Sequence, residues 1–231
     1  MATETSLLKL TKPAVSEAAD ISVLNNNFDL IDAFIKGTGL GKNGTAVDTL
    51  DDAKTFGLYM SNVGVPPIEG KVWWVCLVMP HNTTATMVQI AYRSTSNPTS
   101  FATRRMTDGV WGDWEYINPP MANGVEYRTT ERWGALPVYR KRITHVQEQD
   151  IGETGKTTDY SIAHGISNLG DVLHCEGMLK VSSGSYRFPY LSSNGAFTLV
   201  NSIGNANIVM RMQGAWTATR TWVFDLKYTK A

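Results

Sequence analysis

This sequence has little cysteine and no long apolar run. Its two cysteines, Cys76 and Cys175, lie far apart, and each has apolar or strand-like neighbours. Two buried, reduced thiols are therefore a better interpretation than a structural disulfide. No run of about 18 apolar residues occurs, so we expect no transmembrane helix. The opening segment MATETSLLKLTKPAV lacks a basic stretch followed by an apolar core, so we expect no secretory signal and no membrane insertion.

An excess of one charge is also missing. Lys plus Arg and Asp plus Glu number 21 each, and charged residues make up only 18 % of the chain. Without a basic face, nucleic-acid binding is not expected. Thr, Ser, Asn and Gly are plentiful, and the chain has seven Trp and nine Tyr, a mixture typical of β-rich proteins with many turns. The 231 residues suffice for one large domain or two small ones.

Motifs for cofactors and metals are absent as well. No P-loop, dinucleotide fingerprint or G-x-S-x-G elbow occurs, and the glycine-rich run at 36–41 follows a helical pattern rather than a strand. No CxxC pair is present, and no two histidines have metal-ligand spacing. Three histidines could still converge in the fold: His145, His164 and His174. We expect no cofactor and no metal, and we expect His164 to have a structural role within a strand.

Two carboxylate pairs are the candidates for hydrolytic chemistry. Asp51 and Asp52 are adjacent in a linker or helix cap, whereas Glu148 and Asp150 lie in a polar stretch typical of an exposed loop. A glycosidase needs two carboxylates about 5–10 Å apart across a cleft, and nothing in the sequence favours that placement. We therefore expect no enzymatic activity and no catalytic residue.

The clearest helical pattern lies at residues 20–35, DISVLNNNFDLIDAFI. Its apolar residues are spaced 3, 4, 3, 4, which is the heptad spacing of a coiled coil: Ile21, Leu24, Phe28, Ile31 and Ile35. The Asn and Asp residues between them suit a solvated outer face. Asp20 is a suitable N-cap, and Gly37 and Gly39 are suitable stops. A helix this short is marginal alone, so the stripe is either a seam between chains or an ordinary amphipathic face packed on its own domain.

The segments around this helix contrast with it. Residues 1–19 carry three Leu and then Lys12-Pro13, which predicts an extended arm that packs on a partner, or else a frayed terminus. The strand KVWWVCLVMP at 71–80 is apolar on both faces, which predicts a central strand covered on both sides. FATRRMTDGVWGDWEYI predicts a hairpin with its turn at Asp108-Gly109.

The last hundred residues have an all-β pattern. Asn118-Pro119-Pro120 and the following residues to Gly124 have linker and turn chemistry. Beyond them, short strand-like runs separated by Gly, Asn and Ser predict a sandwich or barrel. The final run places four residues on one face: Trp222, Phe224, Leu226 and Tyr228.

Three stretches of the chain resemble phage tail-fibre and receptor-binding proteins and the fibres of phage-tail-like bacteriocin particles. The opening LTKPAV leading to NNNFDLID is similar to the N-termini of baseplate and tail-fibre proteins. An Arg followed by W-x-x-W-x-x-hydrophobic resembles the closing element of a small knob-like domain, matched here by Arg105, Trp111, Trp114 and Ile117. The C-terminal region resembles receptor-binding heads through VEYRTTERWGALPVYRK, then IAHGISN, then the ending LKYTK.

The resemblance implies a mainly β fold in three parts. These are an N-terminal arm and a trimeric coiled-coil helix at 1–40, a knob-like β domain at 41–120, and a jelly-roll-type β-sandwich head at 121–231. It also implies a homotrimeric virion tail protein, assembled in the host cytoplasm and attached to the tail or baseplate by its N-terminus.

The implied partner of the head is a host cell-surface saccharide or protein. Aromatic faces combined with polar groups suit carbohydrate binding, and the candidate receptor contacts are Tyr186, Arg187, Tyr190 and Trp216. Trp216 is either exposed in a loop or packed over an end of the sandwich. Two alternatives remain: a purely structural baseplate or collar adaptor fibre, and a surface-glycan hydrolase.

Overall fold

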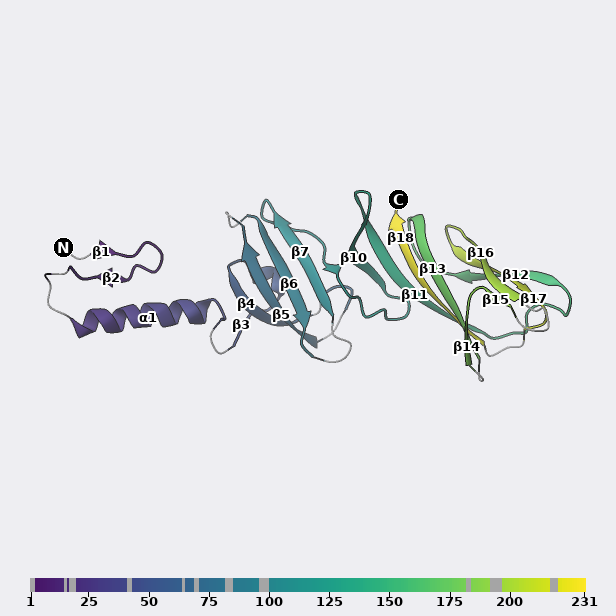
Figure 1. Ribbon diagram of the computed structural model, residues 1–231, viewed down its shortest axis with the longest axis horizontal. Coiled ribbons are helices and arrows are strands. Elements are labelled where there is room, and N and C mark those ends of the chain that lie inside the picture. The colour runs from purple at the N-terminus through teal and green to yellow at the C-terminus, as the bar shows by residue number, and fades with distance from the viewer. Residues whose placement is uncertain are drawn as a thin grey trace. The chain divides into compact units, whose positions relative to one another are not determined.

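The computed structural model shows a mainly β protein, with one α-helix among the residues that it describes (Figure 1). It describes residues 3–14, 16, 20–40, 43–63, 65–68, 71–81, 85–95, 100–181, 184–191, 197–216 and 220–231. The chain divides into two compact units, Met1–Trp114 and Glu115–Ala231. Across the described residues, the search for a helix with the length and apolar character needed to span a membrane found none.

The N-terminal unit begins with a small hairpin and the helix. β1 (Thr3–Glu4) pairs antiparallel with β2 (Thr11–Lys12), so the arm is a hairpin rather than a single extended segment. α1 spans Ile21–Gly37 and begins where expected, because the Asp20 carboxylate accepts a hydrogen bond of 2.8 Å from the amide of Ser22. It ends at the expected glycines, with Gly39 at a φ of +68°.

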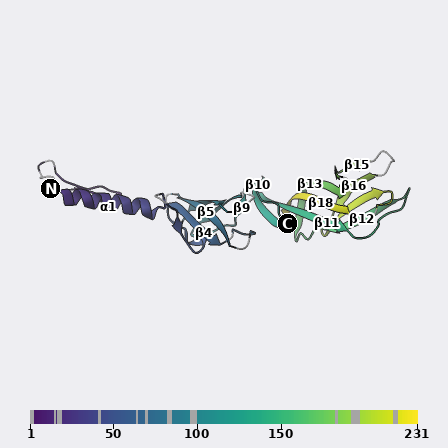
Figure 2. The ribbon, with the colours of Figure 1, turned by 90° about the horizontal axis from the view of Figure 1, so that it is seen from below.

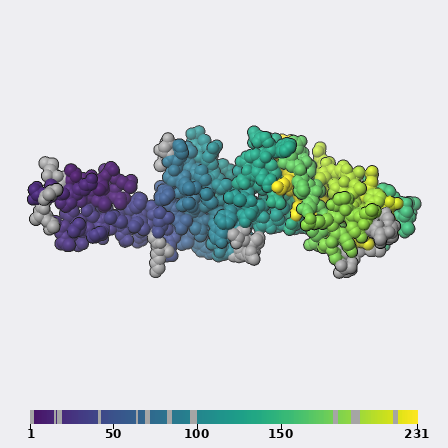
Figure 3. All heavy atoms as spheres, viewed as in Figure 1, coloured from purple at the N-terminus to yellow at the C-terminus, as the bar shows by residue number. Residues whose placement is uncertain are grey.

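The arm lies along the helix, as the purple spheres in Figure 3 show. Asn27 holds it there: its side-chain oxygen accepts from the Thr11 amide at 2.8 Å, and its side-chain nitrogen donates to the Thr11 carbonyl at 2.9 Å. The expectation that every Asn of the helix faces solvent is therefore wrong for Asn27, since it satisfies the backbone of the arm.

One twisted sheet forms the rest of the N-terminal unit. Its strands run in the order β8-β7-β6-β5-β4-β3, with bounds β3 (Thr45–Ala46), β4 (Gly57–Val63), β5 (Lys71–Pro80), β6 (Met87–Arg93), β7 (Phe101–Thr107) and β8 (Val110–Trp111). All neighbours pair antiparallel except β3 and β4. Asp108 and Gly109, at φ values of +52° and +79°, make the predicted turn between β7 and β8.

Strand β5 is central, but it is covered on one face only. Trp74, Cys76 and Val78 are fully buried, whereas Trp73 on the opposite face is 42 % exposed and its neighbours there are half-buried. The 3₁₀ turn η1 (Leu50–Asp52) lies over the buried face, where the Gln89 side chain donates to the carbonyls of Leu50 and of Ala53, the residue that caps the turn. The prediction of a strand covered on both sides is wrong within the single chain, because none of the described segments of this unit covers the Trp73 side of the sheet.

The C-terminal unit is a two-sheet sandwich. The first sheet has the order β9-β10-β11-β18-β13-β14 and the second has the order β12-β17-β16-β15. Their bounds are β9 (Glu115–Tyr116), β10 (Glu126–Trp133), β11 (Leu136–Gln147), β12 (Thr157–Ala163), β13 (Leu169–Val181), β14 (Gly184–Arg187), β15 (Tyr190–Leu191), β16 (Phe197–Ile203), β17 (Asn207–Gln213) and β18 (Arg220–Lys230). Figures 1 and 2 show β11, β18 and β13 side by side.

The core of this unit lies between the two sheets. The predicted face of β18 is buried completely, with Trp222, Phe224 and Tyr228 at 0 % exposure, and it packs with Ile208 and Met210 of the other sheet. The chain passes from one sheet to the other after β11, β12, β14 and β17, as in a jelly roll, whereas β13 to β14 and β15 to β17 are hairpins within one sheet. The expected mainly β class with a sandwich head is confirmed.

Candidate functional site

The apolar stripe of α1 is not buried. Ile21 is 71 % exposed, Phe28 is 65 % exposed and Leu24 is 45 % exposed, and the helix has no buried residue. An amphipathic helix packed on its own domain would bury this face, so that alternative does not describe the structure. Two further exposed side chains, Leu30 and Phe34, widen the apolar surface beyond the predicted seam.

A second apolar surface covers one side of the N-terminal sheet. We call it the open face, and its apolar and aromatic residues are Leu58, Met60, Trp73, Val75, Leu77, Met79, Val88, Ile90, Tyr92 and Phe101. Thr103 and Arg105 of β7 lie on the same side, opposite Ile90 and Val88. The strand register places Leu77 between Leu58 and Ile90. The rings of Tyr92 and Phe101 lie 5.0 Å apart and are each 38 % exposed. A contiguous apolar patch of this kind marks an interaction surface in a soluble protein.

On the opposite side of the same sheet, Arg104 lies between two tryptophans. Its guanidinium carbon is 4.3 Å from the ring centroids of both Trp111 and Trp114. Its Nε donates to Gln89 at 2.8 Å, and its charge is 2.6 Å from the Asp51 carboxylate. Burial lowers the pKa of Arg104, and Asp51 opposes that shift.

We call Arg104 and the two tryptophans that enclose it, Trp111 and Trp114, the Arg104 cage. The Arg104 cage corrects the sequence-based match of Arg105 to the knob-like motif. Side chains alternate along β7, so Arg104 points into the covered side and Arg105 is exposed on the other side. Ile117 is 58 % exposed. The W-x-x-W pair therefore closes this unit on Arg104, and a two-residue alternation rule applied from the buried Ala102 and Met106 could have found it.

Three of the four predicted receptor contacts gather at the β14–β15 connection. The rings of Tyr186 and Tyr190 are 4.6 Å apart and half-buried. The Arg187 side chain is 79 % exposed, and its nearest carboxylate oxygen, on Glu176, is 3.6 Å away. These residues come from two short strands that are also close in sequence, which is why a local pattern could bring them together.

Trp216 is not among them. It is 4 % exposed and belongs to the core, where its ring centroid is 6.2 Å from that of Trp222. Its indole N–H donates to the Gln213 carbonyl at 3.1 Å, and Arg220 lies 4.7 Å above its ring. The expectation of a loop-exposed Trp216 is wrong, because its backbone pairs with Ile151 and carries the ring inward.

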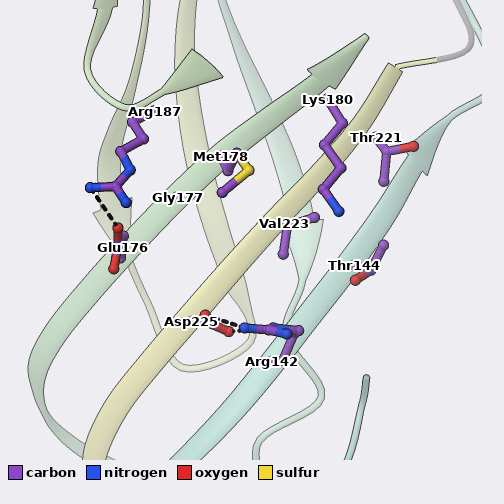
Figure 4. A pocket seen from close by; sticks show the side chains of 10 residues that line it. All are labelled: Arg142, Thr144, Glu176, Gly177, Met178, Lys180, Arg187, Thr221, Val223 and Asp225. Atoms are coloured by element: carbon purple, nitrogen blue, oxygen red, sulfur yellow. Dashed lines mark hydrogen bonds and ion pairs between the residues drawn. The ribbon is translucent and has the colours of Figure 1, made fainter. Parts of the chain in front are cut away.

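The outer face of the first C-terminal sheet contains a cavity of about 420 Å³, which we call the outer-face cavity (Figure 4). It is lined by Arg142, Thr144, Glu176, Gly177, Met178, Lys180, Arg187, Thr221, Val223 and Asp225. Arg142 donates two parallel hydrogen bonds of 2.7 Å to Asp225, and this pairing raises the pKa of Arg142. Sequence reasoning found only Arg187 of this set, since the others are brought together by the register of three distant strands.

Another cavity, of about 470 Å³, lies at the end of β11. It is lined by Thr144, His145, Val146, Glu148, Gln149, Asp150, Ile151 and Tyr160. His145 Nε2 and the Tyr160 hydroxyl are 2.7 Å apart. Among the residues that the structure describes, no three His, Cys, Asp or Glu side chains form a group that could hold a metal.

His164 has a structural role, although it lies just after β12 rather than within it. Its Nδ1 accepts from the Ile166 amide at 3.0 Å, and its Nε2 is 2.9 Å from the Gly204 carbonyl. Since an amide can only donate and a carbonyl can only accept, the neutral ring carries its proton on Nε2. His164 thus joins the loop after β12 to the β16–β17 turn.

Neither cysteine thiol is activated as a nucleophile. Burial raises the pKa of Cys76 to about 12 and that of Cys175 to about 11. Both are free cysteines. At neutral pH each thiol is therefore protonated and a poor nucleophile.

Comparison with known proteins finds matches among solved structures, and those described here are pyocin tail fibres. No family model and no curated protein matches the chain. The matches include the C-terminal residues 323–701 of the P. aeruginosa R1 pyocin fibre, at 9 % identity and a TM-score of 0.28, with 85 % of this chain and 70 % of that one covered. An N-truncated R2-type pyocin tail fibre matches at 12 % identity and a TM-score of 0.25, with coverages of 80 % and 94 %.

A third match is the P. aeruginosa R2 pyocin fibre, C-terminal residues 323–691. It has 11 % identity and a TM-score of 0.26, with 81 % of this chain and 68 % of that chain covered. The chain is thus similar to pyocin tail fibres over most of its length.

Proposed function

We propose that this protein is a homotrimeric tail-fibre protein of a virion or of a phage-tail-like particle. Its N-terminal arm and helix attach it to the tail or baseplate, and its C-terminal unit binds a saccharide or protein on the host cell surface. The observation that carries the proposal is the unburied apolar stripe of α1, with 3-4 spacing in sequence and no buried residue in the single chain. The three sequence resemblances supply the particle context.

Copies of this chain are the occupants that best fit the stripe. Burying an exposed Ile, Leu or Phe side chain stabilises an assembly by about 1.5–3 kcal/mol, so three chains sharing five seam positions offset the cost of forming a short helix. The open face offers a second contact of the same kind. Its ten residues carry no charge, and the charged residue beside them is Arg105, opposite Val88, whose guanidinium would have to stay at the edge of the contact or meet a carboxylate.

The seam is tested by replacing Leu24 and Phe28 with Asp. We expect light scattering to show a particle of three 25.5 kDa chains for the unaltered protein and a single chain for the double variant. A matched control replaces Asn25 and Asn26 with Asp, which adds the same charge at exposed positions outside the seam. An unchanged mass for the Leu24/Phe28 variant would show that the helix does not hold the chains together.

The receptor role is tested by adsorption competition. Purified protein should block adsorption of the particle to its host cells, and the Leu24/Phe28 double variant should block less well, because linked sites act at a high effective concentration. If the unaltered protein neither binds nor blocks host cells, the adaptor-fibre alternative replaces the receptor role.

We also propose that the protein acts by binding alone. Incubation with host surface glycan should then release no reducing sugar above that of a buffer blank. Release that depends on Glu148 or Asp150, the carboxylates beside the cavity at the end of β11, would identify a hydrolase instead.

A further inference from the structure

The outer-face cavity has the chemistry of a binding site for an acidic sugar. Resting on the proposed receptor role, we propose that it binds a saccharide unit that carries a carboxylate or phosphate. Lys180 and Arg187 hold the anionic group, while Thr144 and Thr221 contact ring hydroxyls.

The charges of the lining residues leave a net positive charge. Three cationic side chains, Arg142, Lys180 and Arg187, face two carboxylates, Glu176 and Asp225. The register places the two carboxylates directly opposite each other on β13 and β18, which is unfavourable unless cations separate their charges. Arg142 does so for Asp225 through two hydrogen bonds of 2.7 Å.

The other two cationic side chains, those of Arg187 and Lys180, are not held in tight ion pairs. Arg187 reaches Glu176 through one contact of 3.6 Å, and its side chain is 79 % exposed. The Lys180 amino group has no hydrogen bond or ion pair with any residue that the structure describes. A ligand anion can therefore recruit both without breaking a tight pair, and charge-assisted bonds to an anion are about twice as strong as neutral ones.

The positions of Arg187 and Lys180 allow both cations to contact one anionic group. Arg187 pairs with Met178 across β13 and β14, and Lys180 follows two residues later on the same face. In Figure 4, Met178 lies between Arg187 and Lys180, and the Lys180 amino group extends toward Val223. An anionic group above Met178 would thus meet cations from two strands.

The remaining lining residues favour a sugar over a bare anion. Met178 and Val223 provide an apolar floor, with the Thr144 and Thr221 hydroxyls beside it. A bare phosphate would bring its whole negative charge close to Glu176 and Asp225, whereas sugar hydroxyls can donate to those carboxylates while the acidic group lies at the cations. The volume of about 420 Å³ lies within the range of small-ligand sites and suits one or two sugar rings.

The test uses the full-length protein labelled at its methionine methyl groups, with the Met178 signal assigned through Met178→Leu. Galacturonic acid and glucose 6-phosphate are the acidic probes, and galactose and glucose are their neutral counterparts. We expect at least one acid to shift the Met178 methyl signal to saturation, and its neutral counterpart to bind at least tenfold more weakly. Whichever acid binds identifies the group as carboxylate or phosphate.

Variants decide whether the cavity is responsible. Lys180→Met keeps the length of the side chain and should weaken acid binding at least tenfold. Lys156→Met is the matched control, since Lys156 is an exposed lysine paired with Glu153 outside the cavity. No saturating shift with either acid, equal binding of acid and neutral sugar, or unchanged binding by Lys180→Met would each overturn the proposal.

Adsorption competition separates this inference from the proposed function. If the unaltered protein blocks adsorption and Lys180→Met blocks equally well, the cavity is not the receptor site but the receptor role stands. If the unaltered protein blocks nothing, the receptor role fails, and the sugar titration still decides whether the cavity binds acids.

Discussion

The N-terminal sheet and the C-terminal sandwich differ in what their uncovered faces carry. The N-terminal sheet buries one side under short segments and the Arg104 cage, and it leaves ten apolar or aromatic residues on the other side. The C-terminal unit buries its apolar residues between two sheets, and its uncovered face alternates charge, hydroxyl and small apolar groups.

This difference indicates a division of roles. A sheet whose outer face is apolar needs a partner, because that surface is costly in water. A sheet whose outer face is polar is stable in water and free to bind a hydrated ligand. We therefore place oligomer contact in the N-terminal unit and ligand contact in the C-terminal unit, as proposals that the following experiments test. Stability measurements use the Leu24→Asp, Phe28→Asp background, so that dissociation of the oligomer does not contribute.

The largest expected effect is in the core of the sandwich. Phe224→Ala removes a fully buried ring that stacks 5.9 Å from Phe188, and it should lower the free energy of unfolding by about 3–5 kcal/mol. Urea denaturation followed by tryptophan fluorescence measures this. Val223→Ala, one residue away on the outer face, should cost less than about 1 kcal/mol. Equal losses would contradict the assignment of the two faces.

The second-largest loss in the free energy of unfolding is expected from the Arg104 cage of the N-terminal unit. Arg104→Met removes the ring contacts and leaves the side-chain oxygen of Gln89 buried without its donor, for a loss of about 2–4 kcal/mol. Arg105→Met should change stability by no more than about 0.5 kcal/mol. The same denaturation experiment compares the two. A greater loss from the Arg105 change would restore the sequence-based match to the knob-like motif.

A charge on the open face should act on assembly and not on folding. Ile90→Asp, at a residue 37 % exposed in the single chain, should raise the dissociation constant of the proposed oligomer at least tenfold, about 1.4 kcal/mol. Analytical ultracentrifugation over a range of concentrations measures this dissociation constant, in the protein that retains Leu24 and Phe28. Thr144→Asp on the polar face of the other unit is the control. If the Ile90→Asp oligomer has an unchanged dissociation constant, the open face is not a contact between copies of the chain.

The effect that is smallest near neutral pH, and that grows above pH 9, is a dependence of stability on alkaline pH. Burial raises the pKa of Cys76 from 9.0 to about 12, so above pH 9.0 the unfolded chain loses this proton while the folded chain retains it. The unfolded state then binds fewer protons, and the free energy of unfolding falls as pH rises, by up to about 1.4 kcal/mol per pH unit. Cys76→Ala should flatten the decline between pH 9 and 11 in urea titrations. Parallel curves for the two proteins would show that the thiol ionises normally in the folded state.

Several elements of this fold were accessible from local pattern. The limits of α1 follow from Asp20 and the glycines after it, since capping is a matter of neighbouring residues. The turn at Asp108-Gly109 and the buried face of β18 follow in the same way, from positive φ and from two-residue alternation. The clustering of Tyr186, Arg187 and Tyr190 needed only proximity in sequence.

Other features depended on partners that are distant in sequence. The burial of Trp216 follows from its pairing with Ile151, and the role of Asn27 follows from a backbone segment 16 residues earlier. The outer-face cavity combines side chains of β11, β13, β14 and β18, whose register is set by long-range pairing. A single sequence carries no direct signal for such pairing.

Local sequence encodes two repeat patterns in this protein: a 3-4 apolar stripe for one short helix, and two-residue alternation for the strands that follow. Those patterns specify which residues share a face, because they reflect backbone geometry alone. Only the tertiary structure decided which faces are covered. It left the helix stripe and one side of the N-terminal sheet without a cover, buried Trp216, and placed Lys180 and Arg187 beside a common cavity. Covering a face requires a second layer from elsewhere in the chain or from another copy, and local spacing does not encode which of the two supplies it.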